Sequence, residues 1–187
     1  DRYERSGRWQ RMRLLLEAAR LADPGHHEWP LRLGKLCRRT RDVYDPQYSR
    51  ERMYYKNALH GRPRDAEAAR GMILTLHDLG FWIELLRVIE QQEDLLSLRW
   101  GQTVKAASLV NLERYEEAVP VYSRLEEGDP EGFSCFCQGL IALQCEDWTI
   151  AAELFAFRSP GRSLDVLFQF FHPISMRLAA GEEAAAI

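Results

Sequence analysis

Long apolar runs, catalytic motifs and lysine are missing or scarce in this chain of 187 residues. No apolar stretch approaches the roughly 20 residues that cross a bilayer, so the sequence predicts no membrane span. None of the five histidines lies in an H-E-x-x-H motif, and neither a Gly-rich phosphate loop nor a G-x-S-x-G elbow occurs. We therefore expect no enzymatic activity and no cofactor. Arginine outnumbers lysine 22 to 3, a bias typical of GC-rich bacterial genomes.

Cysteine is also sparse, with four residues and no disulfide-framework spacing. Cys135 and Cys137 are two apart, so they do not have C-x-x-C zinc spacing and point to different faces of a helix. We expect inert, buried helical thiols, no metal site and a reducing cytoplasmic location. The chain starts at Asp1 within a helical pattern, which indicates that it is a fragment. A signal peptide in the residues before Asp1 therefore remains an alternative.

The charge is divided unevenly along the chain. Residues 1–64 hold 16 Lys+Arg against 8 Asp+Glu, a net +8, whereas residues 65–187 hold 9 against 20, a net −11. Such an asymmetry can steer two different partners or stack copies head to tail. A coincidence of solvated helix faces explains it equally well.

An aromatic residue opens an amphipathic run at five places along the chain. The gaps between these residues are 39, 34, 33 and 33: Trp9, Tyr48, Trp82, Tyr115 and Trp148. A period near 34 indicates stacked helix-turn-helix units, none of which buries its apolar face alone. A longer loop over 42–47 accounts for the wide first gap.

The clearest run is the segment from Glu113 to Pro130. Four of its residues fall on one face of an α-helix: Tyr115, Ala118, Tyr122 and Leu125. Gly128 and Pro130 then end the helix. Pro120 lies inside it and predicts a kink.

The repeated pattern resembles the tetratricopeptide (TPR) family. The residues that carry the resemblance in one unit are Ala106, Leu109, Tyr115, Ala118, Tyr122 and Pro130, and in the next Gly139, Ala142, Trp148, Ala151 and Phe155. Met12 and Glu51 stand where the family prefers alanine, so the units at Trp9 and Tyr48 are degenerate.

The resemblance implies an all-α, TPR-like right-handed α-solenoid of antiparallel helix pairs with a C-terminal capping helix. We expect one domain over 1–187, with degenerate basic repeats over 1–64, clearer repeats over 65–160 and the capping helix over 163–180. One helix is predicted over Trp82–Leu96. In the capping segment, Pro173 predicts a kink or a break.

In TPR-like stacks the first helix of each pair lines a concave groove. This register predicts nine groove residues: Leu74, His77, Trp100, Thr103, Val110, Phe133, Phe136, Leu140 and Leu143. Aromatic residues replace the Lys and Asn with which some repeat families clamp a peptide carboxylate, so an apolar helix or extended peptide is favoured as the ligand. The alternative for each residue is packing against neighbouring helices or the C-terminal segment.

A basic stripe gives a second candidate site, formed by Arg32, Lys35, Arg38 and Arg39. It favours an acidic protein partner or solvated surface over nucleic acid, because no aromatic residues suited to stacking bases share the stripe.

We therefore expect a scaffold, adaptor or chaperone that binds an apolar segment of another protein. Nucleic-acid binding by the basic third and a docking role within a larger enzyme remain alternatives, and self-association is left open.

Overall fold

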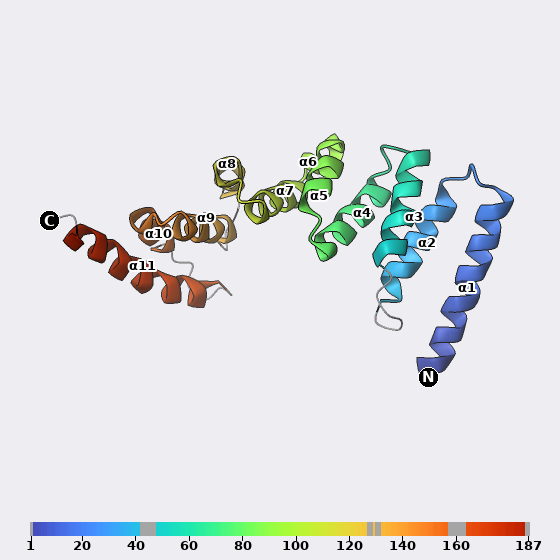
Figure 1. Cartoon of the computed structure of the whole chain (residues 1–187), viewed down its shortest axis with the longest axis horizontal. Coiled ribbons are helices and arrows are strands. Elements are labelled where there is room, and N and C mark those ends of the chain that lie inside the picture. The colour runs from blue at the N-terminus through green and yellow to red at the C-terminus, as the bar shows by residue number, and fades with distance from the viewer. Residues whose placement is uncertain (1, 42–47, 127–128, 130–131, 157–163, 186–187) are drawn as a thin grey trace. The chain divides into compact units, whose positions relative to one another are not determined.

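The described residues of the computed structural model are 2–41, 48–126, 129, 132–156 and 164–185. They form helices joined by turns and contain no strand. The chain forms two compact units, residues 1–98 and 99–187. Unit 1 contains α1 (Arg2–Ala22), α2 (Glu28–Arg39), α3 (Tyr48–Gly61), α4 (Ala66–Leu79), α5 (Trp82–Glu90) and α6 (Glu93–Leu96). Unit 2 contains α7 (Arg99–Asn111), α8 (Tyr115–Glu126), α9 (Phe133–Gln144), α10 (Trp148–Phe155) and α11 (Asp165–Ala185). Within each unit, consecutive helices pack side by side (Figure 1).

The turns inside three helix pairs have the same backbone geometry. Gly80, Glu113 and Glu146, each 33 residues from the next, have φ values of 70°, 59° and 61°. The next residue in each turn donates its N–H back to the preceding helix, as from Phe81 to the Leu76 carbonyl at 2.9 Å. This 6→1 hydrogen bond satisfies a helix carbonyl that would otherwise lack a partner. The sequence repeat is therefore also a repeat of turn structure.

Asp65 is the N-cap residue of α4. Its carboxylate accepts the N–H groups of Glu67 and Ala68 at 3.0 and 2.9 Å, which caps the free donors of the first turn. Asp147 caps α10 in the same way through the N–H of Ile150 at 3.2 Å. These caps fix where the repeated helices start.

In unit 1 the core is built around Tyr55 of α3. Its ring lies against Gly34 of α2 and Gly71 of α4, so closely that a Cβ added at Gly71 would lie 2.3 Å from the ring. The side chain of Tyr55 is fully buried, and α3 packs on both α2 and α4. Glycine is required here because a side chain would occupy the volume of the ring.

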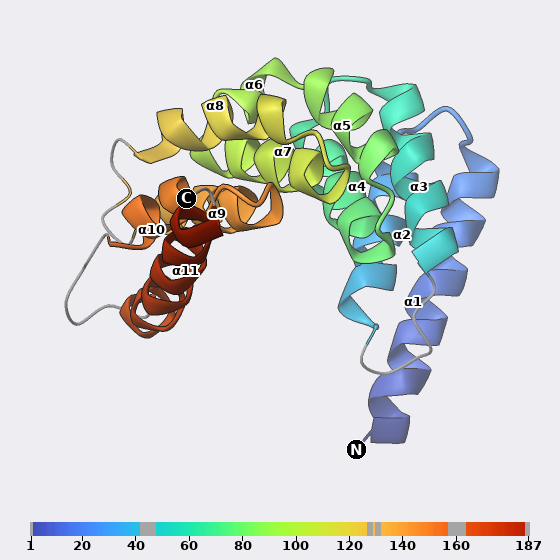
Figure 2. The same cartoon turned by 60° about the vertical axis from the view of Figure 1, so that its left-hand side comes forward.

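In unit 2 Phe155 of α10 has the equivalent place. A Cβ added at Gly139 of α9 would lie 2.7 Å from its ring. Phe155 and Phe168 of α11 are both fully buried, and α11 packs along α10 (Figure 2). The predicted capping helix therefore covers the end of unit 2.

Two helices differ from the sequence predictions. The helix predicted over 82–96 is divided at Gln91 and Gln92, because the buried Gln92 amide donates to the carbonyl of Pro63 at 2.8 Å and the chain turns there. The capping helix starts at Asp165 and continues through Pro173 to Ala185, so the predicted break is wrong. The predicted loop over 42–47 and the closing residues Gly128 and Pro130 lie outside the described residues.

We expect Gly71→Ala to lower the free energy of unfolding by about 1–3 kcal/mol, because the new methyl group would overlap the buried Tyr55 ring. Urea denaturation followed by circular dichroism measures this change. The control is Gly7→Ala, where an added Cβ meets nothing within 4 Å and removal of a helical glycine should stabilise by about 0.5–1 kcal/mol. Equal effects of the two substitutions would contradict the close-packing account.

Candidate functional site

An aromatic cluster joins α9, α10 and α11 in unit 2. The ring of Phe136 on α9 lies 5.7 Å from that of Phe155, 5.5 Å from that of Phe168 and 5.7 Å from that of Phe171. All three pairs meet edge to face, which is a favourable geometry for aromatic rings. An apolar helix of the chain is thus docked on α9 and α10 (Figure 2).

The same side of α9 continues into exposed apolar surface. Phe133 and Leu140 are seven residues apart, and the two residues are 43% and 36% exposed. By helical spacing they adjoin Phe136 and Leu143, both of which belong to the packed cluster. We call Phe133 and Leu140 the α9 ledge. The ledge is apolar, and it begins where the surface covered by α11 ends.

The start of α9, which carries Phe133, is held by Asp129. The Asp129 carboxylate accepts the N–H of Ser134 at 2.6 Å and lies 3.5 Å from the Arg99 guanidinium of α7. Gly132 has φ 74°, a left-handed conformation that glycine adopts without strain. These contacts fix the ledge to the first helix of the preceding pair.

The nine predicted groove residues are distributed over both units. Leu74 is half-buried and His77 is exposed on α4 in unit 1. Trp100, Thr103 and Val110 are half-buried on α7 in unit 2. On α9, Phe136 is buried in the aromatic cluster and Leu143 is half-buried beside it. The structure therefore groups four of the nine on one side of α9, and a groove that joins all nine stays a prediction.

Sequence reasoning did not anticipate which residues α11 contributes. Phe168, His172 and Pro173 line a cleft of about 410 Å³ together with Phe155 and Gln169. A second cleft of about 350 Å³ lies further along the seam between α10 and α11. The high content of phenylalanine in the segment was the available signal, but it does not reveal which side of the helix packs inward.

The predicted basic stripe on α2 is largely paired within unit 1. Arg32 bonds to Glu28 at 2.9 Å, and Lys35 forms an ion pair with Glu67. Arg38 lies 3.4 Å from Glu51 and 3.8 Å from Asp78, whereas Arg39 is exposed. The role of these four residues as a contact face stays a prediction, with three of the four charges already facing a carboxylate.

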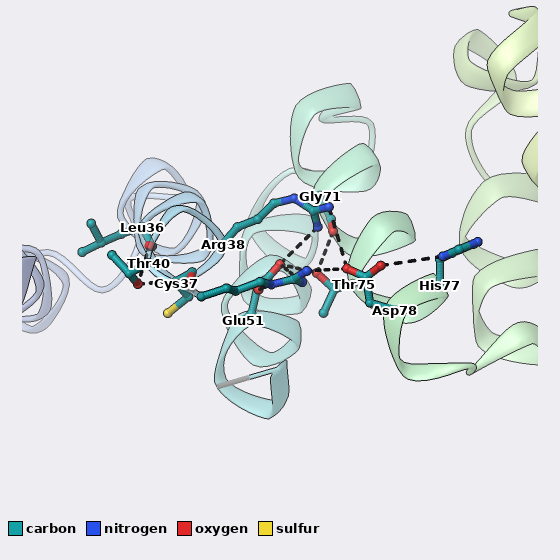
Figure 3. Close-up of polar contacts among 10 residues, drawn as sticks. Leu36, Cys37, Arg38, Thr40, Glu51, Gly71, Thr75, His77 and Asp78 are labelled. Atoms are coloured by element: carbon teal, nitrogen blue, oxygen red, sulfur yellow. Dashed lines mark hydrogen bonds and ion pairs between the residues drawn. The ribbon is translucent and has the colours of Figure 1, made fainter. Parts of the chain in front are cut away.

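Glu51 is the centre of a buried polar cluster (Figure 3). Its side chain is only 1% exposed, and Arg41 donates to both of its carboxylate oxygens, each at 2.8 Å. The Thr75 hydroxyl lies 2.6 Å from the same carboxylate and 2.8 Å from the Gly71 carbonyl. A buried carboxylate is tolerated when opposite charge and hydrogen bonds replace water. Glu51 stands where the TPR family prefers alanine, and its contacts with Arg41 and Thr75 offset the cost of burying its carboxylate.

The cluster also affects Arg41 itself. Burial opposes its charge, but hydrogen bonds to Glu51 and Asp78 outweigh this effect and raise the pKa of Arg41. Its guanidinium additionally lies 4.4 Å from the centre of the Tyr48 ring. The arrangement is that of a permanent ion-pair network.

The thiols occupy different environments. Cys145 is exposed, so the expectation that all the thiols are buried is wrong for this residue. Burial raises the pKa of Cys37, and likewise that of Cys137, to about 11. Among the described residues, no group of three or more His, Cys, Asp or Glu side chains is placed to hold a metal ion. Nor is any helix of the described part long and apolar enough to cross a membrane.

No protein-family model matches the chain, and no curated protein matches it in sequence. Solved structures do match. MamA from Desulfovibrio magneticus RS-1 has 18% identity and a TM-score of 0.65 over 81% of this chain and 84% of that one. The Naa15/Naa10 structure bound to HypK-THB has 14% identity and a TM-score of 0.71, over 98% of this chain but 28% of that one. YrrB, described as a TPR protein with an unusual peptide-binding site, has 17% identity and a TM-score of 0.56 over 75% and 71%.

These similarities confirm the fold predicted from the sequence. The chain has an all-α, TPR-like helical solenoid fold. Identities of this size show the fold alone, so the absence of enzymatic activity remains an expectation.

We expect Glu51→Gln to lower the free energy of unfolding by about 3 kcal/mol, because two guanidinium groups would lose their buried counter-charge. Urea denaturation measures the change. The matched control is Glu28→Gln, which breaks the exposed pair with Arg32 and should cost less than about 1 kcal/mol. A loss at position 51 no larger than the control would show that Glu51 does not stabilise unit 1.

We expect Cys145 to be alkylated first when the folded protein is treated briefly with iodoacetamide at pH 8. The raised pKa of Cys37 and Cys137, about 11 against an ordinary 9.0, lowers their thiolate fraction by about 100-fold, and the thiolate is the nucleophile. Peptide mass spectrometry gives the rate at each site. Urea-unfolded protein is the control, in which the three rates should converge. Equal rates in the folded protein would contradict these thiol environments.

Proposed function

We propose that this chain is a protein–protein interaction module that binds an apolar helix or peptide segment of a partner on the α9 ledge. A scaffold, adaptor or chaperone would act in this way. The observation that carries the proposal is that α11, an apolar helix, already packs beside the ledge on α9 and α10.

The chemistry of this packing supports a helix as the ligand. α11 presents Phe168 and Phe171 to Phe136 and Phe155, so the contact is made by four aromatic rings. Amphipathic helices bind grooves through apolar side chains at positions i, i+3, i+4 and i+7. Phe133 and Leu140 would extend such a row of contacts beyond the surface that α11 occupies.

The ledge offers enough apolar surface to contribute measurably to affinity. Burial of apolar surface contributes about 25 cal/mol per Å², and a fully buried Phe or Leu side chain contributes about 1.5–3 kcal/mol before ordering costs. Partial exposure at positions 133 and 140 means that a partner would gain only part of this. The binding would depend little on salt, unlike binding to a phosphate backbone.

Proteins of similar structure support the general role. The Naa15/Naa10 structure contains bound HypK-THB, and the YrrB structure is described by its peptide-binding site. The fold therefore serves protein or peptide binding in other chains.

The ion pairs on α2 do not favour the nucleic-acid alternative. Glu28, Glu67 and Glu51 each face a basic residue of the stripe, which reduces the uncompensated positive charge there. The same pairing weakens the argument for an acidic protein partner at this stripe. A protein partner on α9 is the better supported hypothesis.

We expect Phe133→Asp/Leu140→Asp to lose the partner recovered by the unchanged chain from nuclease-treated lysate of the source cells. For the partner segment then identified, the affinity should fall by about 10–100-fold, because about 1.4–2.8 kcal/mol of apolar burial is lost. Fluorescence titration with the synthetic segment measures the change.

The matched control is Met53→Asp/Ile83→Asp, which places the same charges on exposed apolar residues of unit 1 and should leave the affinity unchanged. Circular dichroism verifies that both variants keep their helices. If the ledge variant recovers the same proteins with the same affinity, the proposed site is wrong. A partner lost only after nuclease treatment would instead support the nucleic-acid alternative.

A further inference from the structure

Two clefts follow the seam between α10 and α11 in unit 2. The first, of about 410 Å³, is lined by Phe168 and Pro173 among others, and the second, of about 350 Å³, is lined by Glu153 and Met176 among others. His172 lines both clefts, so the two adjoin. Each is within the range of volumes at which proteins bind ligands, about 300–1,000 Å³. We call the two clefts together the seam groove.

Aromatic rings set the distance between α10 and α11. Phe171 of α11 stacks on Phe155 of α10 with 5.3 Å between the ring centres, and Phe168 lies 6.3 Å from the same ring. These rings fill the flank of α11 that carries Phe171, so this part of the interface is closely packed. The other flank must span the same distance with the side chains that it carries.

The side chains on that other flank are too short to close the seam. Four alanines line the second cleft, Ala152 and Ala156 from α10 and Ala179 and Ala180 from α11. An alanine side chain is a single methyl group, so alanines on two helices held apart by aromatic rings leave space between them. Met176 lies in the same wall, and its flexible side chain can adapt to a group that enters this space.

The seam groove is elongated. Its lining residues on α11 run from Phe168 to Ala180, twelve positions, which corresponds to about 18 Å along a helix axis. An extended peptide covers this length with about five or six residues at roughly 3.3 Å each. A compact small molecule would occupy only one part of the groove.

The charge of the groove favours a cationic ligand. Glu153 is exposed, and it is the one carboxylate among the described lining residues. Arg177, the one basic residue of α11 besides His172, lies opposite Phe168 by helical spacing and so points away from α10. A lysine or arginine side chain suits such a site, because its aliphatic stem covers apolar surface while its charged end remains in water.

We propose that the seam groove binds an extended peptide segment of a partner protein, with a lysine or arginine side chain at Glu153. The stem of this side chain lies along Met176 and Ala180, and small or aliphatic neighbours occupy the rest of the groove. This inference goes beyond the proposed function, because the groove includes neither Phe133 nor Leu140. Unit 2 would thereby offer partners two separate surfaces.

Selection from a phage-displayed library of random heptapeptides tests the proposal. The full unchanged chain is the bait. Counter-selection on Ala180→Phe removes peptides that bind elsewhere, because the added ring fills the second cleft. Ala180 is exposed, so the substitution should not unfold the chain, and circular dichroism checks this. The retained peptides should carry lysine or arginine beside aliphatic residues, and a synthetic copy of one should bind with a Kd of about 10–100 μM.

Fluorescence titration with that synthetic peptide measures what each part of the groove contributes. Ala180→Phe should weaken binding by about 10-fold or more, because it removes the apolar contact. Glu153→Gln should weaken binding by about 2–5-fold, since an exposed ion pair contributes little. The matched controls are Ala22→Phe and Glu116→Gln, which make the same changes at exposed positions of α1 and α8 and should leave the Kd unchanged.

Three results would overturn the proposal. The first is that no peptide is retained by the unchanged chain and lost on Ala180→Phe. The second is that the selected peptides lack lysine and arginine, or that Glu153→Gln leaves their affinity unchanged. The third is that a free amine, 1-aminohexane, displaces the peptide at an equal concentration, which would indicate a small-molecule ligand.

The seam groove and the α9 ledge can fail separately. The Phe133→Asp/Leu140→Asp variant should bind the selected peptide as the unchanged chain does, because both residues lie outside the groove. Loss of peptide binding in that variant would place the peptide on the ledge and contradict the seam groove as its site.

Discussion

Both units depend on the close packing of an aromatic ring against glycine. Tyr55 lies against Gly34 and Gly71 in unit 1, and Phe155 lies on Gly139 in unit 2. Without a Cβ at these glycines, the backbone of the facing helix approaches the ring directly, and the ring fills the space that two side chains would otherwise share. This contact sets how closely the facing helices approach each other. It thereby also positions the side chains on the outer sides of these helices.

Glu51 shows how the packing tolerates an unsuitable residue. At the equivalent places in unit 2, Ala118 and Ala151 are fully buried, which suits a tight helix crossing. A carboxylate there needs counter-charge, which Arg41 and Arg38 provide, and the Thr75 hydroxyl adds a hydrogen bond. The consequence reaches the surface, because Arg38 is thereby turned toward the core and not toward an external ligand. The apparent basic character of the first third is in part an internal compensation.

The capping helix α11 relates the interior of unit 2 to its surroundings. Its inner side completes the aromatic cluster with Phe136 and Phe155, whereas its exposed residues include Val166 and Phe170. The α9 ledge lies beside this aromatic cluster, and its two apolar side chains remain partly exposed.

The sequence by itself determined the helical repeat, because the aromatic spacing near 33 residues, the Asp65 cap and the turn at Gly80 act through local backbone chemistry. Tyr115 and Trp148, which the sequence identifies as the openers of amphipathic runs, are therefore the first residues of α8 and α10. The break at Gln92 could not, because it depends on the carbonyl of Pro63, 29 positions away. Only the tertiary structure decided that Phe136 is covered while Phe133 is exposed, and that Arg38 pairs with Glu51. The physical reason is that periodicity shows which residues share a side of a helix, whereas burial and ion pairing depend on the helix that packs against that side.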